Sequence, residues 1–343
     1  MQRRSVAQDT ISVHFVLEAL QAVARHDVPV PLVKVLDKAG IPASFLDEPL
    51  ARVSPQQFGI LWRELALQID DEFFALDRRG VRRGTFAMLC TALLHCKNLH
   101  QVLRRICRYT SILFDDIRAE LDVQGDVATL RLHDAQARAT PFAHATYFMA
   151  LYGVVCWLIA HRISLLQCRL GGQAGTFGAE YRIMFCEDLT FGAVDASLTF
   201  PSELLKRPVR QNAASLRTFL LHSPDVFLVK YRNTDSLAGR VRMWLRSMAP
   251  GDWPELPQAA QHLGLSTATF RRRLGHEGVT FQSIKNDLRR DMAITQLRST
   301  TQSLEDLAHR LGFTETAAFH RAFRKWTGMR PSDYRQNLPA ADR

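Results

Sequence analysis

The apolar residues near the end of the chain recur at intervals of three and four, which is the spacing of a helix with one buried face. Leu304, Leu307 and Leu311 share such a face. Ser303 stands where a helix needs an N-cap, and Gly312 stands where a helix ends in a left-handed residue. The pattern predicts one short helix between these two residues.

A second helix is predicted from Glu315 or Thr316 to Gly328. Its apolar face holds Ala318, Phe319, Ala322, Phe323 and Trp326. Two short helices joined by a tight turn that contains glycine form a helix-turn-helix, whose second helix presents its non-core face to the DNA major groove. We expect the residues of that face to contact DNA, namely Thr316, Ala317, His320, Arg321, Arg324 and Lys325.

The same pattern occurs once more upstream. Residues 260–265 (AQHLGL) match residues 308–313 (AHRLGF), and Phe270 and Leu274 correspond to Phe319 and Phe323. This internal repeat predicts two helix-turn-helix units, at about 256–276 and 304–327. The expected DNA-facing residues of the first unit are Thr267, Ala268, Arg271 and Arg272.

The apolar spacing of residues 281–299 predicts one long helix between the two units. At ~1.5 Å per residue such a helix spans roughly 28 Å. Major-groove faces on one side of B-DNA recur every ~34 Å, so the two recognition helices can reach adjacent turns of one duplex. Because the two units differ in sequence, we expect an asymmetric site rather than a palindrome.

These residues also carry a family resemblance. The run LGF-x5-FHRAFRKWTGMRPSDYR, with LEDLAHR before it, resembles the C-terminal signature of the AraC/XylS family of bacterial transcription regulators. The resemblance covers residues 237–336 and implies a DNA-binding regulator, an activator more often than a repressor, with RNA polymerase as a partner. The base sequence that the first unit recognises cannot be transferred from a relative.

The front of the chain has a different pattern. Helices are predicted at 12–26, 32–39, 54–69, 85–96, 99–110, 141–162 and 204–221, and strands at 117–123, 127–133, 165–170, 181–186 and 191–200. The predicted fold is an α+β domain with a small antiparallel sheet and no cupin barrel, followed by an all-α domain. Its order of elements resembles regulators of the ornithine-utilisation and VirS type, which implies that it senses a small molecule.

Domain boundaries follow from these patterns. We expect an effector-sensing and dimerisation domain at 1–222, a linker at 223–236 and the DNA-binding domain at 237–336. An effector site is expected between the sheet and the helices at 85–110 and 141–162, because ligand sites favour such junctions. The candidate residues there are Thr85, His95, Tyr109, His144, Tyr147 and Trp157.

Charge supports a nucleic-acid partner. The chain has a net charge of +10, and residues 237–336 hold 16 Lys+Arg against 9 Asp+Glu. Release of counterions from DNA phosphates would supply affinity there. The apolar run at 147–160 is too short to span a bilayer and no signal peptide is evident, so we expect a cytoplasmic protein.

Two other functions are considered. The six cysteines form no CxxC pair, and no nucleophile or paired-carboxylate pattern appears, so the sequence predicts no metal, cofactor or catalytic residue. A DNA-repair enzyme that transfers alkyl groups to a cysteine is one alternative. A haem-type sensor with His95, His144 or a cysteine as axial ligand is the other. Homodimerisation through 147–160 or 204–221 is left open, as are the effector and the operator.

Overall fold

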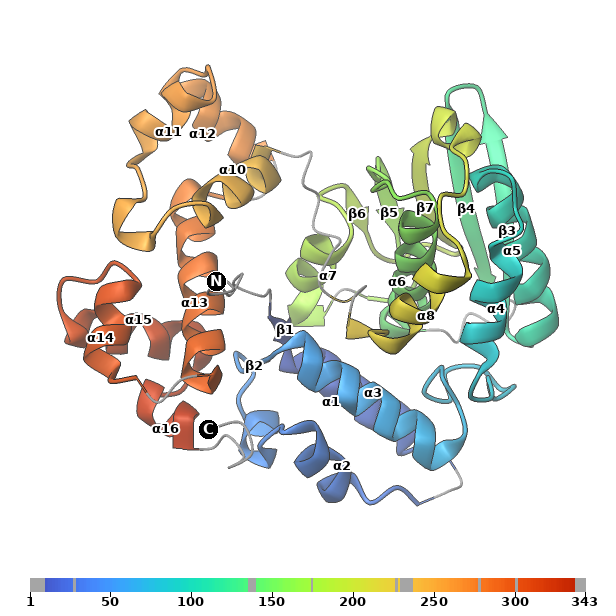
Figure 1. Ribbon diagram of the computed structural model, residues 1–343, viewed down its shortest axis with the longest axis horizontal. Helices are drawn as coiled ribbons and strands as arrows, with labels where there is room; N and C mark the ends of the chain where they lie inside the picture. The colour runs from blue at the N-terminus through green and yellow to red at the C-terminus, as the bar shows by residue number, and fades with distance from the viewer. Residues whose placement is uncertain are drawn as a thin grey trace. The chain divides into compact units, whose positions relative to one another are not determined.

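The computed structural model describes residues 10–26, 29–134, 140–173, 175–225, 228, 237–276, 279–299 and 302–336. The chain divides into two compact units. The C-terminal unit combines residues 1–13, 40–57 and 234–343, and the N-terminal unit combines residues 14–39 and 58–233. Each unit is described by itself (Figure 1).

The N-terminal unit is α+β, as predicted from the sequence. Its helices are α1 (Val13–Val23), α2 (Leu32–Ala39), α3 (Pro55–Ile69), α4 (Thr85–Leu93), α5 (Leu99–Leu113), α6 (Pro141–Leu158), α7 (Gly178–Met184) and α8 (Ala213–Leu221). The local sequence determines where several of these helices begin. Asn98, Thr140 and Asn212 each cap a helix by accepting a backbone N–H with the side chain.

A five-stranded sheet in the order β3-β4-β7-β5-β6 lies behind the helices. Its strands are β3 (Ile117–Gln124), β4 (Val127–Asp134), β5 (Gln167–Arg169), β6 (Leu189–Thr190) and β7 (Ala196–Pro201). The predicted hairpin pairs Gln124 with Val127 across a turn at Gly125. Helices α5 and α6 pack on one face of this sheet, where Leu103 and Val155 meet Leu130 and Leu198.

Helix α6 is long and apolar enough to cross a membrane by length and composition, but 78% of it is buried. Its apolar residues, Phe148 and Leu151 among them, belong to the core of the N-terminal unit. The structure therefore agrees with the prediction of a buried helix.

Two details of the predicted sheet are wrong. Residues 181–186 belong mainly to helix α7 rather than to a strand, and Tyr181 and Phe185 bury their rings in the core from one helical face. A short run with two apolar ends fits either period, so the pattern alone could not decide. The sheet is also not wholly antiparallel, because β5 pairs with β6 in parallel.

The C-terminal unit is built mainly from helices. They are α10 (Leu237–Arg246), α11 (Leu256–His262), α12 (Thr267–His276), α13 (Phe281–Ser299), α14 (Leu304–Arg310), α15 (Thr316–Thr327) and α16 (Pro331–Gln336), with a 3-10 turn η4 at Pro250–Asp252. Figure 1 shows α13 between two groups of helices, α10 to α12 at one end and α14 to α16 at the other. Phe270, Leu274, Ile284 and Leu288 share the first core.

Two segments from the front of the chain complete the C-terminal unit. Strand β1 (Ile11–Ser12) pairs antiparallel with β2 (Arg52–Val53), and the turn η1 (Ala43–Asp47) carries Phe45. The ring of Phe45 lies 4.8 Å from that of Tyr334 on α16, and both side chains are fully buried. The Tyr334 hydroxyl donates a hydrogen bond of 2.6 Å to the carbonyl oxygen of Arg52.

A buried polar network ties these segments to α13. The hydroxyl of Thr10 donates to the carboxylate of Asp291 at 2.7 Å and accepts from Nε of Arg52 at 2.8 Å. Arg52 also donates to the Thr10 carbonyl oxygen at 2.9 Å. Asp291 is wholly buried, so its charge depends on such donors. We call Thr10, Arg52, Asp291 and Tyr334 the anchoring network.

This grouping differs from the domain boundary expected from the sequence. The start of the C-terminal unit near residue 234 is close to the predicted 237, but residues 40–57 had been expected in the front domain. The amphipathic pattern of short segments does not say which core they join. Of the expected linker, only residues 223–225 and 228 lie within the described residues.

We predict that Thr10→Val lowers the free energy of unfolding by about 1–3 kcal/mol, because a buried carboxylate loses a donor while the side-chain volume is kept. Urea denaturation followed by tryptophan fluorescence and circular dichroism measures the change. Thr218→Val is the matched control, since Thr218 is exposed on α8. Equal unfolding curves for the two variants would show that the anchoring network contributes nothing.

Candidate nucleic-acid interface and ligand cavity

The two helix-turn-helix units close their turns in the same way. In the first, Leu265 N–H donates to Ala260 at 2.9 Å, and in the second Phe313 N–H donates to Ala308 at 3.0 Å. Gly264 lies in the first turn with a φ of 68°, and Gly312 lies in the second turn with a φ of 78°. This left-handed conformation favours glycine and lets the next helix leave at a sharp angle. The sequence repeat is therefore a structural repeat.

Helix α12 presents an open basic face. Ser266 caps it by accepting the Thr269 N–H at 3.2 Å. Phe270 and Leu274 point into the core, as expected. Of the predicted DNA-facing residues, Ala268, Arg271 and Arg272 are exposed and Thr267 is half-buried.

Helix α15 has the same division of faces. Phe319 and Phe323 are fully buried. The exposed members of the predicted DNA-facing set are Ala317, Arg321, Arg324 and Lys325, and the half-buried members are Thr316 and His320. His320 differs from the rest, because its Nε2 is buried and has no hydrogen-bond partner among the described residues.

Charge pairing separates the recognition helices from the connector. On α13, Arg290 pairs with Asp287 at 3.2 Å, and Lys285 pairs with Glu255 at 3.0 Å. On α12 and α15, no basic side chain forms an ion pair with any residue in the described part of the chain. The unpaired basic side chains are Arg271, Arg272, Arg273, Arg321, Arg324 and Lys325. Their charges are thus available to phosphates or base edges.

Arg289 of α13 connects the two helix-turn-helix units. Its Nε donates to the carbonyl oxygen of Leu311, at the end of α14, at 2.9 Å. Its guanidinium lies 5.2 Å from the ring of Trp253 in the first unit and 5.4 Å from the ring of Phe313 in the second. Burial lowers the pKa of Arg289 from its ordinary value. Sequence analysis assigned this residue no role, because a single arginine on an amphipathic helix gives no signal of its partners.

A second contact supports the same junction. Gly312 lies against η4 of the first unit, and a Cβ on it would come within 2.8 Å of the Pro250 carbonyl oxygen. This turn therefore needs glycine for its close approach as well as for its conformation. The two helix-turn-helix units are therefore held together by helix α13 and by the contact between Gly312 and Pro250.

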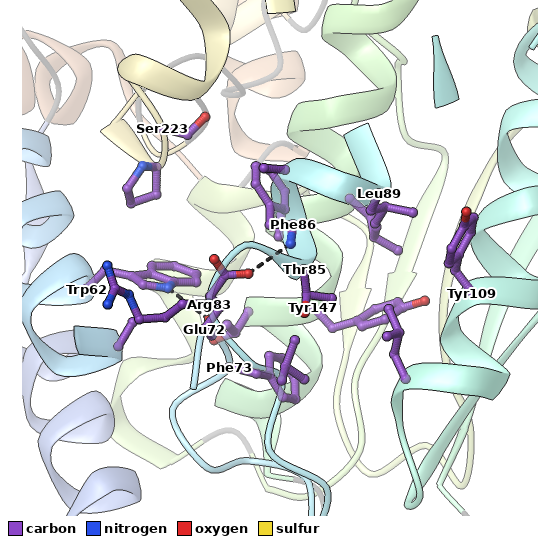
Figure 2. Close-up of a pocket in the computed structure, with 18 of the residues that line it drawn as sticks. Trp62, Glu72, Phe73, Arg83, Thr85, Phe86, Leu89, Tyr109, Tyr147 and Ser223 are labelled. Carbon is purple, nitrogen blue, oxygen red and sulfur yellow. Dashed lines mark hydrogen bonds between the residues drawn. The ribbon is translucent and has the colours of Figure 1, made fainter. Parts of the chain in front are cut away.

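The N-terminal unit contains a cavity of about 380 Å³. Figure 2 shows Trp62, Glu72 and Arg83 on one side of it and Tyr109 on the other. It is lined by residues of α3, α4, α5 and α6, by the loop before α4 and by Leu220, Ser223 and Pro224. Three of the predicted effector residues line it, namely Thr85, Tyr109 and Tyr147.

The other three predicted effector residues lie elsewhere. His95 is exposed beyond the end of α4, and Trp157 stacks on Phe219 with ring centroids 4.4 Å apart. His144 is buried, accepts the Gly171 N–H at 3.2 Å, and has its pKa lowered by burial. The cavity also does not lie against the sheet, where an effector site had been predicted. Leu130 and Leu198 fill that space with α5 and α6 and leave about 20 Å³.

The cavity wall before α4 is shaped by carboxylates that accept backbone N–H groups. Asp71 accepts from Phe73, Ala75 and Val81 at 2.7 to 3.2 Å. Glu72 accepts from Gly84 and Phe86, in the first turn of α4, at 2.7 and 2.8 Å. Burial raises the pKa of both carboxyl groups, and the backbone hydrogen bonds act against this rise. These bonds fix the loop that carries Arg83.

The six cysteines are free thiols, and all but Cys107 are buried. Burial raises the pKa of Cys90 and Cys186 to about 12 and that of Cys107 to about 11. A thiol that accepts an alkyl group needs a lowered pKa. Within the described residues, no three His, Cys, Asp or Glu side chains gather as a metal site would require.

Two helix-turn-helix units with free basic faces define the class of this protein, a DNA-binding transcription regulator. The profile of the arabinose-binding domain of AraC transcription regulators matches residues 31–209, and a helix-turn-helix domain profile matches residues 259–337. The first match covers more than half of the chain, so the protein belongs to the AraC family of transcription regulators.

Individual proteins are similar to this chain. The ornithine utilization regulator of Pseudomonas aeruginosa is 28% identical over 305 residues, which cover 88% of this chain and 90% of the relative. The transcriptional regulator VirS of Mycobacterium tuberculosis is 31% identical over 167 residues, 48% of this chain and 47% of the relative. The crystal structure of the transcriptional regulator CdpR of P. aeruginosa aligns over 94% of this chain and 98% of its own at 22% identity, with a TM-score of 0.30. The resemblance seen in the sequence is confirmed, and the protein is a regulator rather than an enzyme.

We predict that Arg289→Met weakens binding to a duplex with both half-sites about 5- to 30-fold and leaves binding to short single half-sites nearly unchanged. The reason is that the substitution removes a hydrogen bond and two ring contacts from the junction, worth about 1–2 kcal/mol together. Fluorescence anisotropy with the two kinds of duplex measures this.

Arg240→Met is the matched control, because Arg240 is exposed on α10 and the same charge is lost. An equal loss on full and half-sites would mean that Arg289 contacts DNA itself or that the unit has unfolded.

Proposed function

We propose that the protein is a sequence-specific regulator that places α12 and α15 in two adjacent major grooves of double-stranded DNA. The supporting observation is that two recognition helices with unpaired basic faces sit on one body joined by α13 and Arg289. The proposed contacts are made by Thr267, Ala268, Arg271, Arg272, Thr316, Ala317, Arg321, Arg324 and Lys325. His320 is retained as a candidate, and because its Nε2 is buried its ring would have to rotate to contact DNA.

The DNA site of this proposal is asymmetric. Helix α12 offers three adjacent arginines, Arg271 to Arg273, whereas α15 offers arginines one turn apart together with a histidine. Different side chains favour different bases, so each half-site should have its own sequence. Phosphate contacts of Arg324 and Lys325 would fix the position of α15 without adding sequence preference.

The cavity is the proposed effector site. The lining of the cavity does not suit arabinose, which the family profile has in its name, or ornithine, which the ornithine utilization regulator has in its name. Arabinose would bring several hydroxyl groups into a mainly apolar wall, and ornithine would bring two amino groups to a site whose one carboxylate, Glu72, already accepts two backbone N–H groups.

Helix α3 suggests how an effector could influence DNA binding. Its first turn, Pro55–Gln57, belongs to the C-terminal unit and follows β2, which carries Arg52 of the anchoring network. Its later residues Trp62, Arg63 and Ala66 line the cavity. A ligand that favours one position of α3 would bias the anchoring network through this continuous helix, provided that its affinity differs between the two states.

The remaining parts of the proposal follow from the family. We propose an activator that works with RNA polymerase in the cytoplasm, as the relatives are transcription regulators. Dimerisation through α6 is not proposed, because most of its apolar surface is buried in the core. A haem sensor is also disfavoured, because neither His95 nor His144 lines the cavity.

We predict that Arg271→Ala and Arg321→Ala each weaken operator binding about 5- to 150-fold and relax the base preference in one half-site only, since a bidentate base contact contributes about 1–3 kcal/mol. The operator is first selected from random duplexes with the unaltered protein, and each variant is then tested on single-base changes. The preference should change in different half-sites for the two variants.

Arg217→Ala controls for the lost charge, because Arg217 is exposed on α8 of the N-terminal unit. Unchanged affinity and base preference in both variants would refute the assignment of α12 and α15 as recognition helices.

A further inference from the structure

We propose that the cavity of the N-terminal unit binds a neutral, mainly apolar molecule whose one oxygen group, a carbonyl or a hydroxyl, forms a hydrogen bond with the hydroxyl of Thr146. The inference rests on the proposed function in taking this occupant as the effector. It names a class of ligand that differs from the sugar in the name of the family profile and from the diamino acid in the name of a relative.

The wall of the cavity favours an apolar body. Aromatic rings come from four parts of the unit, with Trp62 on α3, Phe73 in the loop before α4, Tyr109 on α5 and Tyr147 on α6. Aliphatic side chains, Leu89 of α4 among them, line much of the rest. A volume of about 380 Å³ is near the lower end for small-molecule sites. One ring with a short chain suits such a space.

Thr146 on α6 is a buried polar residue of this wall that lacks a partner. It is 2% exposed, and its hydroxyl forms no hydrogen bond with any residue in the described ranges. Unlike Nε2 of His144, its oxygen is not wholly enclosed by protein atoms, so an occupant of the cavity can reach it. A hydroxyl both donates and accepts, and it therefore suits a carbonyl or a hydroxyl of a ligand.

Other threonines inside helices satisfy their hydroxyl groups locally. Thr91, Thr110 and Thr327 each donate to the carbonyl oxygen four residues earlier, at 2.8 to 2.9 Å. This is the usual arrangement when a helical threonine does not reach solvent. Thr146 has neither this bond nor an exposed position. Because a buried hydroxyl without a partner is costly, a ligand that supplies one gains affinity.

Other polar groups of the wall already have partners. The Thr110 hydroxyl donates to the Ile106 carbonyl oxygen at 2.9 Å, so it accepts from the Tyr147 hydroxyl at 2.6 Å. Nε1 of Trp62 donates to the Glu72 carbonyl oxygen at 3.0 Å. Groups that are satisfied in this way gain little from a ligand. They therefore favour an occupant with few polar groups.

An ion pair at the edge of the cavity neutralises one of its charges. Arg63 pairs with Asp225 at 3.0 Å and donates to the Ser223 carbonyl oxygen at 2.9 Å. Gly59 of α3 leaves room for this carboxylate, since a Cβ at that position would overlap its oxygen. The charge of Arg63 is thus balanced within the unit.

The other two charged residues of the lining also need no charge from a ligand. Both oxygens of Glu72 accept N–H groups at the start of α4, and Figure 2 shows the bond to Phe86. Arg83 is exposed, so water solvates its guanidinium. A carboxylate or an ammonium group would lose its own water on entering this apolar wall. A neutral occupant avoids that cost.

The test uses the full chain and probes of one shape. 4-Phenyl-2-butanone and 4-phenyl-2-butanol carry one oxygen, butylbenzene carries none, and 3-phenylpropionate and 3-phenylpropylamine carry a charge. Isothermal titration calorimetry measures affinity. We expect the ketone and the alcohol to bind, butylbenzene to bind about 5- to 10-fold more weakly, and both charged probes to bind more weakly than the ketone by at least about tenfold.

Substitutions of one hydroxyl provide the matched variants. Thr146→Val keeps the side-chain volume and should reduce the affinity for the ketone and the alcohol to that for butylbenzene, which should not weaken. Thr146→Ser keeps the hydroxyl and should keep the preference for the ketone. Thr91→Val removes an exposed hydroxyl of α4 outside the lining and should change nothing. Ala150→Leu, which reduces the cavity volume from α6, should weaken every probe.

The proposal is overturned if butylbenzene binds as tightly as the ketone, if Thr146→Val keeps the preference for the ketone, if a charged probe binds most tightly, or if no probe binds. Operator binding is measured on the same preparations. Normal operator binding without binding of the ketone or the alcohol rejects the ligand class alone, whereas absence of operator binding in the unaltered protein rejects the proposed function.

Discussion

One guanidinium contacts both helix-turn-helix halves of the C-terminal unit. Arg289 lies between Trp253 of the first unit and Phe313 of the second while it donates to Leu311. A half-buried arginine is costly to desolvate unless its donors and its faces have partners. Here those partners come from both units, so the charge is accommodated only when the units are in contact. Gly312 against Pro250 adds a steric condition to the same arrangement.

In the C-terminal unit, paired and unpaired basic residues lie on different helices. On the connector, Lys285 and Arg290 form ion pairs with carboxylates, whereas α12 and α15 keep their basic side chains unpaired within the described residues. A connector with free charges would bind DNA in many positions, because phosphate attraction carries no sequence information. Concentrating free charge on two helices limits binding to the geometry that those helices share.

Sequence alone predicted the parts of the structure that have strong periodicity. Both helix-turn-helix units and the 281–299 connector are found where the apolar spacing and the two glycines indicate, and Phe270, Leu274, Phe319 and Phe323 are buried as expected. It failed where long-range packing decides, as in helix α7, the place of the cavity and the partners of Arg289. Thr10, Arg52 and Tyr334 form one network although they are far apart in the chain, and no local pattern could reveal this.

The discontinuous make-up of the C-terminal unit affects any attempt to divide the protein. A fragment that begins at residue 234 would contain every predicted DNA contact. It would lack Phe45 and Arg52, which contact Tyr334, and it would lack Thr10, which donates to Asp291. Cutting there would uncover an aromatic core residue and remove a donor from a wholly buried carboxylate. Studies of the isolated C-terminal unit therefore need residues 10–13 and 40–57 joined to the fragment. Without these segments the fragment would be less stable than the same unit in the full chain.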